Sequence, residues 1–106
     1  MSSLSTHVLD LVTGRPAVGV GVVLETLGGE RIGGGTTDRD GRIRDLAPHL
    51  APGVYKITFA TGAWFAATGT TGFYPSVPIV FEVADGGHHH VPLLLGPYGY
   101  STYRGS

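Results

Sequence analysis

Three adjacent histidines, His88, His89 and His90, stand at the start of an apolar run and are the residues whose type and spacing most directly suggest chemistry. In a β-strand, His88 and His90 point to one face and His89 to the other. Imidazole titrates near neutral pH, so this pair could perform general acid–base catalysis. With His7 from a neighbouring strand, it could instead bind a catalytic zinc ion. The plainest alternative is a solvated strand edge without a chemical role.

Two further residues are candidates for such a site. His7 alternates with Leu9 and Leu11, which places it on the apolar side of its strand. A histidine there is more often a core residue with a satisfied hydrogen bond than a catalyst. Arg42 follows the turn at residues 38–41, and an isolated arginine there is usually a surface residue of a hairpin. Its planar guanidinium would nevertheless suit a flat anionic ligand.

Several other chemistries find little support in the sequence. The turn at residues 38–41 resembles part of a calcium loop but lacks the third spaced carboxylate and the distal glutamate. The glycine clusters at residues 28–29 and 33–35 lack the Gly-Lys-Ser/Thr ending of a phosphate loop. There is no Gly-x-Ser-x-Gly motif, no His-Glu-x-x-His motif and no cysteine. Nucleophilic serine, helical zinc, thiol and disulfide chemistry are therefore not indicated.

Composition narrows the possible partners and location. Charged residues make up 14% of the 106 residues and the net charge is −1, so no electrostatic footprint for nucleic acid or an anionic membrane is present. The start of the chain lacks the pattern of a signal peptide. No apolar run approaches the ~18 residues of a membrane span. We expect a cytoplasmic protein that binds neither nucleic acid nor membrane.

The elements that position these residues are predicted to be strands. Eighteen glycines and seven prolines argue against long helices, and apolar residues alternate with period two at 18–24, 55–59 and 79–83. The pattern predicts about eight strands, near residues 6–12, 18–26, 31–36, 42–46, 54–60, 78–84, 89–95 and 99–104, and one short helix around 63–67. Many short strands at regular spacing indicate an all-β sandwich, with residues 1–106 forming a single domain.

Longer motifs add a resemblance to a known family. The first sixty residues look like a prealbumin-like or carboxypeptidase-regulatory sandwich, which is often purely structural. Five segments spread over the chain closely resemble the 5-hydroxyisourate hydrolases, the purine-catabolic enzymes of the transthyretin-like family. The matching segments are Ser5–Asp10, Asp40–Ile43, Phe73–Val77, His88–Leu95 and Tyr100–Ser106. The Tyr-Arg-Gly-Ser ending is the most specific of these, because in that family it separates the hydrolases from the hormone-binding transthyretins.

The resemblance implies a prealbumin-like (transthyretin-like) sandwich of two four-stranded sheets with one short helix. It also implies a homotetramer, a dimer of dimers with the sites in a channel at the dimer–dimer interface, and no metal or other cofactor. The consecutive leucines at Leu93–Leu95 place apolar side chains on both faces of their strand, and only one face can pack into the core. The other face is compatible with contact to a partner subunit. The implied catalytic residues are His7, Arg42 and His90, and the implied substrate-binding residues are Tyr103, Arg104, Gly105 and Ser106. His88 is implied to lie next to the catalytic residues without contacting the substrate.

The implied reaction is hydrolysis of 5-hydroxyisourate to 2-oxo-4-hydroxy-4-carboxy-5-ureidoimidazoline in urate degradation, by addition of water across the N1–C6 amide. In our hypothesis, neutral His7 or His90 takes the proton of the water, and the sequence leaves open which one does so. Arg42 would clamp the ring and stabilise the oxyanion, while Ser106 and the tail backbone close the pocket. Two other functions remain alternatives: a carrier of an aromatic hormone-like ligand, and a structural or adhesive module.

Overall fold

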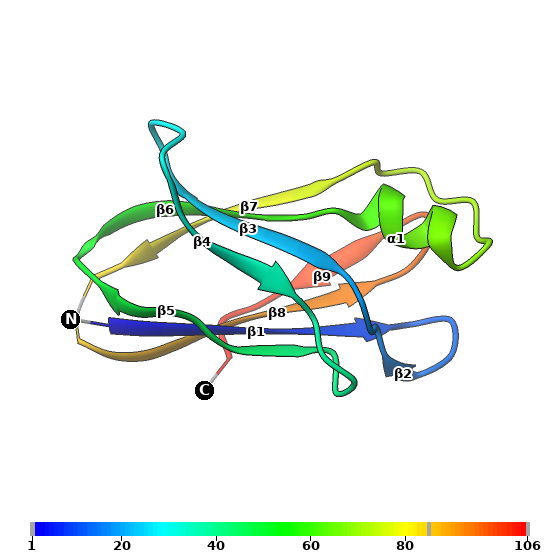
Figure 1. The fold of residues 1–106 in the computed structure, drawn as a ribbon, viewed down its shortest axis with the longest axis horizontal. Helices are drawn as coiled ribbons and strands as arrows, with labels where there is room; N and C mark the ends of the chain where they lie inside the picture. Colours follow the sequence, from blue (N-terminus) through cyan, green and yellow to red (C-terminus); the bar gives the residue numbers. More distant parts are fainter. Residues whose placement is uncertain (1, 85, 106) are drawn as a thin grey trace.

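The computed structural model describes residues 2–84 and 86–105, which form nine strands and one helix (Figure 1). The elements in chain order are β1 (Ser2–Asp10), β2 (Arg15–Pro16), β3 (Gly21–Thr26), β4 (Arg31–Thr36), β5 (Arg42–Leu50), β6 (Gly53–Phe59), α1 (Thr61–Ala67), β7 (Val77–Val83), β8 (Gly87–Leu95) and β9 (Tyr100–Thr102). They fold into two sheets that pack face to face around one core. The predicted all-β sandwich is therefore confirmed.

Strand β1 lies in the middle of the first sheet. It pairs in parallel with β8 along its whole length, from Ser2 opposite Gly87 to Asp10 opposite Leu95. Its other side pairs antiparallel with β5 and, near its end, with β2, while β9 extends the sheet beyond β8. The second sheet has the antiparallel order β4-β3-β6-β7. The first sheet thus places β1 and β8, from opposite ends of the chain, side by side, with β5 on the other side of β1.

The sequence-based boundaries need several corrections. The first sheet has five strands rather than four, because the two-residue strand β2 adds to it. Strand β1 begins at Ser2 rather than near residue 6, since its serine-rich start is held by pairing with β8 and carries no apolar alternation. Strand β5 continues to Leu50 rather than ending near residue 46, and α1 begins at Thr61. Strand β9 covers only Tyr100–Thr102 of the predicted 99–104.

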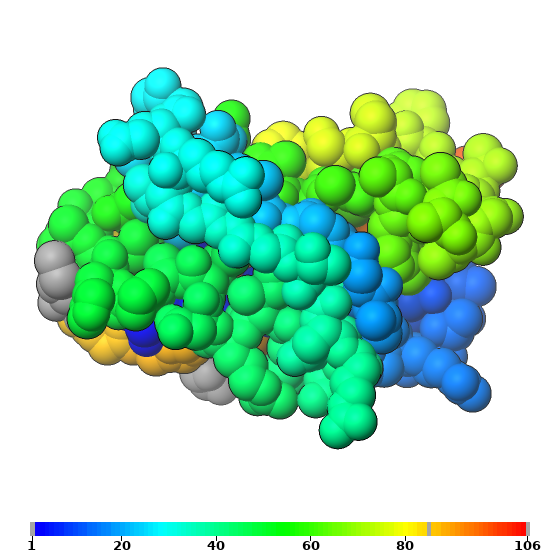
Figure 2. Space-filling model, viewed as in Figure 1, coloured from blue at the N-terminus to red at the C-terminus, as the bar shows by residue number. Residues whose placement is uncertain are grey.

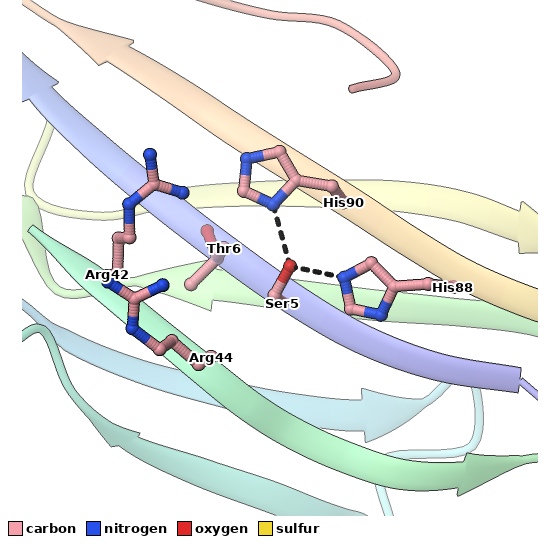
Figure 3. A pocket seen from close by; sticks show the side chains of 6 residues that line it. All are labelled: Ser5, Thr6, Arg42, Arg44, His88 and His90. Carbon is pink, nitrogen blue, oxygen red and sulfur yellow. Dashed lines mark hydrogen bonds between the residues drawn. The ribbon is translucent and has the colours of Figure 1, made fainter. Parts of the chain in front are cut away.

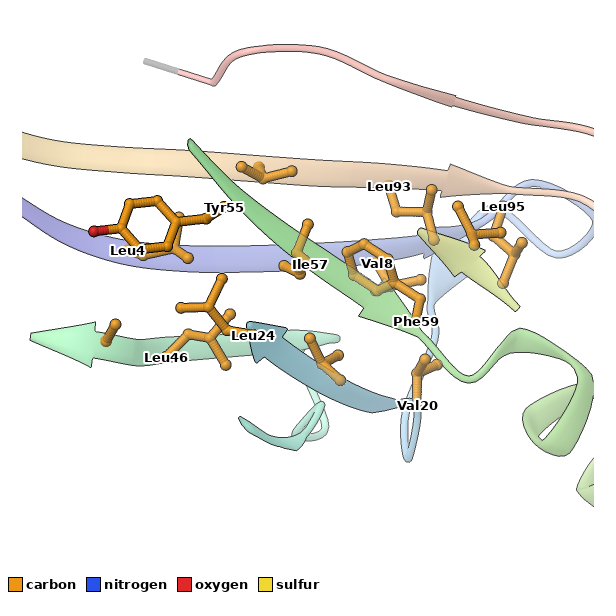
Figure 4. Packing of buried hydrophobic residues seen from close by; sticks show 14 of the residues in the cluster. Leu4, Val8, Val20, Leu24, Leu46, Tyr55, Ile57, Phe59, Leu93 and Leu95 are labelled. Carbon is orange, nitrogen blue, oxygen red and sulfur yellow. The ribbon is translucent and has the colours of Figure 1, made fainter. Parts of the chain in front are cut away.

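The core lies between the two sheets and is built mainly from alternate residues of β1, β3, β6, β7 and β8, together with residues of β5 (Figure 4). Leu4 and Val8 of β1 are fully buried there, together with Leu93 of β8. Thr6 points the same way, and its hydroxyl can be buried because it donates to the Val91 carbonyl at 2.6 Å. His7 therefore lies on the opposite, outer face of β1. Its predicted place on the apolar side was wrong, because the side of β1 that packs into the core is the one defined by Leu4 and Val8 rather than by Leu9.

The helix α1 covers one end of the sandwich and, with β4 and β5, forms much of the face seen in Figure 2. Phe65 is buried in the core, and the indole Nε1 of Trp64 donates to the Val18 carbonyl at 2.8 Å. This helix has seven residues. Within residues 2–84 and 86–105, no helix has the length and apolar character needed to cross a membrane.

Candidate active site

A polar cleft of about 350 Å³ opens on the outer face of the first sheet, where β5, β1 and β8 run side by side. Its volume falls in the range of small-molecule sites, roughly 300–1,000 Å³. The residues that line it are Ser5, Thr6, Arg42, Arg44, His88 and His90. Figure 3 shows Ser5 between the two imidazole rings, with both arginines reaching toward the cleft from the strand on the other side of β1. Three strands thus combine guanidinium and imidazole groups in one cleft.

Arg42 is positioned by the turn that precedes β5. The Asp38 carboxylate accepts the Arg42 backbone N–H at 3.0 Å, and this hydrogen bond is the main reason why the pKa of Asp38 is lowered. Gly41 has φ +73°, and a Cβ there would lie 2.5 Å from the Val8 carbonyl oxygen, so the turn packs directly on β1. Arg42 therefore starts β5 directly opposite His7. The turn that resembled part of a calcium loop therefore positions Arg42 in this structure.

Arg44 lines the same cleft and was missed by the sequence reasoning. Between the pairs Thr6–Ile43 and Leu4–Ala47 the register of β5 shifts, so β5 carries more residues than β1 over this stretch. Such bulges re-aim side chains at the edges of sites. The available signal was that residues 42 and 44 alternate along one strand and so share a face. The Arg44 ion pair with Asp40, at 3.5 Å and well exposed, contributes little to stability.

The three adjacent histidines divide between the two faces of β8, as the sequence predicted. His89 is 6% exposed and faces the core, while His88 and His90 lie on the outer face. The Ser5 hydroxyl lies 2.8 Å from His90 Nδ1 and 2.7 Å from His88 Nε2. The Ser3 hydroxyl lies 2.6 Å from His88 Nδ1. These serines escaped the sequence reasoning, because only the parallel register of β1 and β8 places them beside the histidines.

Burial and positive charge keep the site histidines neutral. Burial is the main cause that lowers the pKa of His90, followed by the positive charge of Arg42 and then by His7 and His88. The pKa of His7 is lowered by burial first and by Arg42 second, although a hydrogen bond to the Asp40 backbone partly opposes this. His7 does not line the cleft itself but lies beside it, opposite Arg42. Both imidazoles can therefore accept a proton near neutral pH.

The zinc alternative finds no geometric support in the part of the chain that the structure describes. Within those residues, no group of three or more histidine, aspartate or glutamate side chains is arranged so that it could hold a metal ion. His88 and His90 instead share the Ser5 hydroxyl, and His7 lies across from Arg42. Both ring nitrogens of His88 and the Nδ1 of His90 are thus within hydrogen-bond distance of serine hydroxyls rather than directed at a common metal position.

The C-terminal tail passes along the other side of His90. The Gly105 N–H donates to the His90 carbonyl at 2.9 Å, and a Cβ on Gly105 would lie 2.4 Å from His90 Cδ2. Tyr103 and Arg104 line a second, mainly apolar cavity of about 250 Å³, shared with Ile79 and Phe81 and bordered by His90. The tail residues are therefore brought to His90 but not into the polar cleft. Ser106, also implied as a substrate-binding residue, lies outside the described residues.

The fold and the site together define a β-sandwich whose outer sheet face carries neutral histidines beside guanidinium groups. The chain belongs to the HIUase/Transthyretin family, whose model matches residues 4–105. This membership confirms the resemblance seen in the sequence motifs.

Individual relatives agree with this membership. The chain is 49% identical to the 5-hydroxyisourate hydrolase of Salmonella dublin, in a match that covers 97% of this chain and 80% of that protein. The solved structure of Klebsiella pneumoniae 5-hydroxyisourate hydrolase superposes with a TM-score of 0.94 at 44% identity, over 100% of both chains. Sea bream transthyretin in complex with thyroxine gives a TM-score of 0.89 at 32% identity, over 97% of this chain and 94% of that one. The transthyretin-like fold is thereby established.

Proposed function

We propose that this chain is an enzyme that hydrolyses 5-hydroxyisourate to 2-oxo-4-hydroxy-4-carboxy-5-ureidoimidazoline in purine catabolism. The observation that carries the proposal is one cleft in which His90 is held neutral beside Arg42, with His7 next to it. Relatives from Salmonella dublin and Klebsiella pneumoniae, at 49% and 44% identity, carry the name of this hydrolase. The catalytic groups are His7, Arg42 and His90.

The chemistry requires a base for water, a stabiliser for the oxyanion and an acid for the leaving nitrogen. A neutral imidazole in the cleft takes the proton of the attacking water. The Arg42 guanidinium stabilises the charge that develops on the C6 oxygen and holds the flat ring. A second cation, Arg44, adds positive potential on the same side of the cleft. The imidazole that has become protonated can then give its proton to N1 as the amide bond breaks.

Hydrolysis of freshly generated 5-hydroxyisourate, followed by ultraviolet absorbance, tests the proposal. Arg42→Ala is expected to lower turnover by roughly 10²–10³ through loss of a charge stabiliser. Loss of the general base, by His90→Ala or His7→Ala, is expected to cost roughly 10²–10⁴. His49→Ala is a matched control, because His49 lies on β5 but is exposed outside the cleft. Wild-type rates equal to the spontaneous background would reject the enzyme.

The metal-free character of the mechanism is tested separately by exhaustive chelation. Each function required has a protein group in or beside the cleft: His90 or His7 for the proton transfers and Arg42 for the oxyanion. Activity is therefore expected to survive chelation. Activity that is lost and then restored by zinc would instead support the three-histidine metal site.

A hormone-carrier function is the alternative suggested by the likeness to sea bream transthyretin. The cleft argues against it, because it is lined by charged and hydrogen-bonding side chains with little apolar surface for an aromatic ligand. The two functions separate in one experiment, calorimetric titration with thyroxine beside the hydrolysis assay. Tight binding of thyroxine by a chain without hydrolytic activity would favour the carrier.

The proposed enzyme is a homotetramer, a dimer of dimers with the active sites at the dimer–dimer interface. The outer sheet face that carries the cleft also carries Leu9 and Leu94 in partly exposed positions, and Leu11 is 53% exposed nearby. Apolar side chains beside a polar cleft are suited to burial against another copy. Light scattering at micromolar concentration tests this assembly. A monomer that retains full activity would contradict a site shared between subunits.

A cytoplasmic location without membrane or nucleic-acid partners completes the proposal. It is supported by the net charge of −1, which offers no general attraction to anionic surfaces. Cell fractionation with an antibody against the chain tests it, and enrichment in a membrane fraction or an exported fraction would contradict it.

A further inference from the structure

A continuous hydrogen-bonded chain leads from the catalytic His90 to the surface of the protein. It runs from His90 Nδ1 to the Ser5 hydroxyl over 2.8 Å, on to His88 Nε2 over 2.7 Å, and from His88 Nδ1 to the Ser3 hydroxyl over 2.6 Å. Ser5 is 9% exposed, whereas His88 is exposed. The chain therefore connects a nearly buried hydroxyl in the cleft with groups that water reaches.

The parallel pairing of β1 and β8 makes this arrangement regular. Ser3 lies opposite His88 and Ser5 lies opposite His90. The same serine–histidine pair is thus repeated after two residues along both strands. All four side chains share the outer face, because residues two apart in a strand point the same way. Figure 3 shows Ser5 bridging the two imidazole rings.

Two proton arrangements satisfy every member of the chain. In the first, His90 Nδ1–H donates to Ser5, Ser5 donates to His88 Nε2, and His88 Nδ1–H donates to Ser3, which leaves the lone pair of His90 Nε2 free to act as a base. In the second, every donor and acceptor is reversed, and His90 carries its proton on Nε2. One proton entering at His90 Nε2 and one leaving at His88 Nδ1 converts the first arrangement into the second.

Resting on the proposed hydrolysis, we propose that Ser5 and His88 form a relay that carries the product proton from His90 to solvent. When water opens the N1–C6 amide, one of its protons ends on N1 and the other on the new carboxylic acid. That acid ionises near neutral pH, so one proton must leave the cleft in each turnover. His90 Nε2 takes this proton, His90 Nδ1 passes one to Ser5, Ser5 passes one to His88 Nε2, and His88 Nδ1 releases one to water. After the product has left, water in the open cleft takes the Nε2 proton of His90 while His88 takes one from solvent through the reversed chain, so each turnover releases one net proton to water.

The charges around the chain favour outward transfer. Arg42 and Arg44 from β5 and His7 from β1 lie on the side of His90, and Arg104 of the tail borders the second cavity beside it. A proton held on His90 is therefore repelled by the Arg42 guanidinium, whereas His88 is open to solvent. Ser5 and His88 act through His90 and are positioning residues of the reaction rather than groups that contact the substrate.

The kinetic test compares Ser5→Ala and His88→Gln with wild type at low and high concentrations of imidazole buffer. At low buffer both variants are expected to be slower than wild type by roughly 10- to 100-fold, less than the loss of a complete general base. Added imidazole is expected to restore them, because a small base can replace the missing relay. Ser76→Ala, which removes an exposed hydroxyl outside the cleft, serves as the control and is expected to match wild type at every buffer concentration. Variants as fast as wild type, or slow by the same factor at every buffer concentration, would overturn the relay.

A second measurement does not depend on activity. Long-range ¹⁵N–¹H NMR spectra report which ring nitrogen of each histidine carries the proton. In wild type, both rings are expected to carry their protons on the same nitrogen, both on Nδ1 or both on Nε2, and Ser5→Ala is expected to make the two tautomers independent. Opposite or unrelated tautomers of His90 and His88 in the wild-type protein would reject the chain. If matched tautomers are found in a protein that does not hydrolyse 5-hydroxyisourate, the proposed function fails while the hydrogen-bonded chain stands.

Discussion

The two faces of the β1–β8 pair have opposite characters although they share one backbone. The inner face presents Leu4, Val8 and Leu93, which are fully buried between the sheets. The outer face presents Ser5 and His90, which are hydrogen-bonded to each other and border the cleft. One residue of shift in the register would exchange these faces. The comparison teaches that the apolar core sets the register, and that the register in turn places the polar groups of the cleft.

The arrangement also explains how a chain of this size can hold a polar site precisely. The backbone pairing from Ser2–Gly87 to Asp10–Leu95 is continuous, so residues of the outer face cannot move without disturbing the core beneath them. Sites carried on paired strands are more rigid than sites carried on loops. The first sheet therefore contributes to the core on its inner face and carries the polar cleft on its outer face, whereas the second sheet mainly covers the core.

The largest expected effect is a loss of stability on the inner face. Leu93→Ala removes a side chain that is fully buried, and such truncations cost about 2–5 kcal/mol. The turnover of the molecules that remain folded is expected to stay close to wild type, because Leu93 does not line the cleft. Urea denaturation and the activity per folded molecule measure the two quantities. Leu27→Ala, at an exposed leucine in the turn after β3, is the matched control and is expected to cost less stability. Equal losses at both positions would break the comparison.

The next largest effect is expected on turnover, from a substitution at Gly105, the tail residue that packs against His90. A Cβ at Gly105 would overlap the His90 ring, so Gly105→Ala must displace either the tail or the imidazole. A displacement of a catalytic group by about 1 Å can cost up to ~10²-fold in rate. The loss is expected in kcat with little change in the urea midpoint, since the residue lies outside the core. Gly99→Ala is the control, because a Cβ there meets nothing within 4 Å. Unchanged kcat in Gly105→Ala would show that the tail does not position His90.

These two predictions mark what the sequence could and could not reveal. Alternation along a strand was enough to separate His89 from His88 and His90, because that pattern is local. The pairing of Ser5 with His90 joins residues that lie 85 positions apart, and no local pattern encodes such a register. The pairing of β5 with β1, which brings Arg44 to the same cleft, is likewise a contact between strands far apart in the sequence. The family motifs indicated the fold and His90, and the three-dimensional pairing supplied the neighbours of His90.

A smaller and graded effect is expected from pH. Because burial and then Arg42 lower the pKa of His90 below its ordinary value of 6.5, the base stays neutral at pH 7 and below. The value of kcat/KM is expected to fall as pH decreases, with an inflection below about 6.5. The free energy of unfolding is expected to fall over the same pH range, because His90 binds a proton more readily in the unfolded chain than in the folded one.

Arg42→Gln sharpens this pH test. Removal of the positive charge is expected to move the NMR-detected pKa of His90 upward, toward its ordinary value. The exposed arginine of the neighbouring turn provides the control, and Arg39→Gln is expected to leave the titration of His90 unchanged. A His90 titration that is the same in wild type and Arg42→Gln would mean that the guanidinium does not act on this imidazole.

The smallest effect is expected at Arg44, which lines the cleft from the same strand as Arg42. Its side chain is 68% exposed, so water screens its charge, and its contact with Asp40 is long at 3.5 Å. An exposed cation of this kind attracts an electron-rich substrate without discriminating the transition state, which raises affinity more than turnover. Arg44→Gln is therefore expected to raise KM by roughly two- to five-fold, the order of ~1 kcal/mol or less for an exposed charge, and to leave kcat nearly unchanged. The KM increase should shrink at high ionic strength, where wild type loses the same attraction. A fall in kcat as large as that of Arg42→Ala would instead place Arg44 on the oxyanion, and the division of labour between the two arginines would have to be reversed.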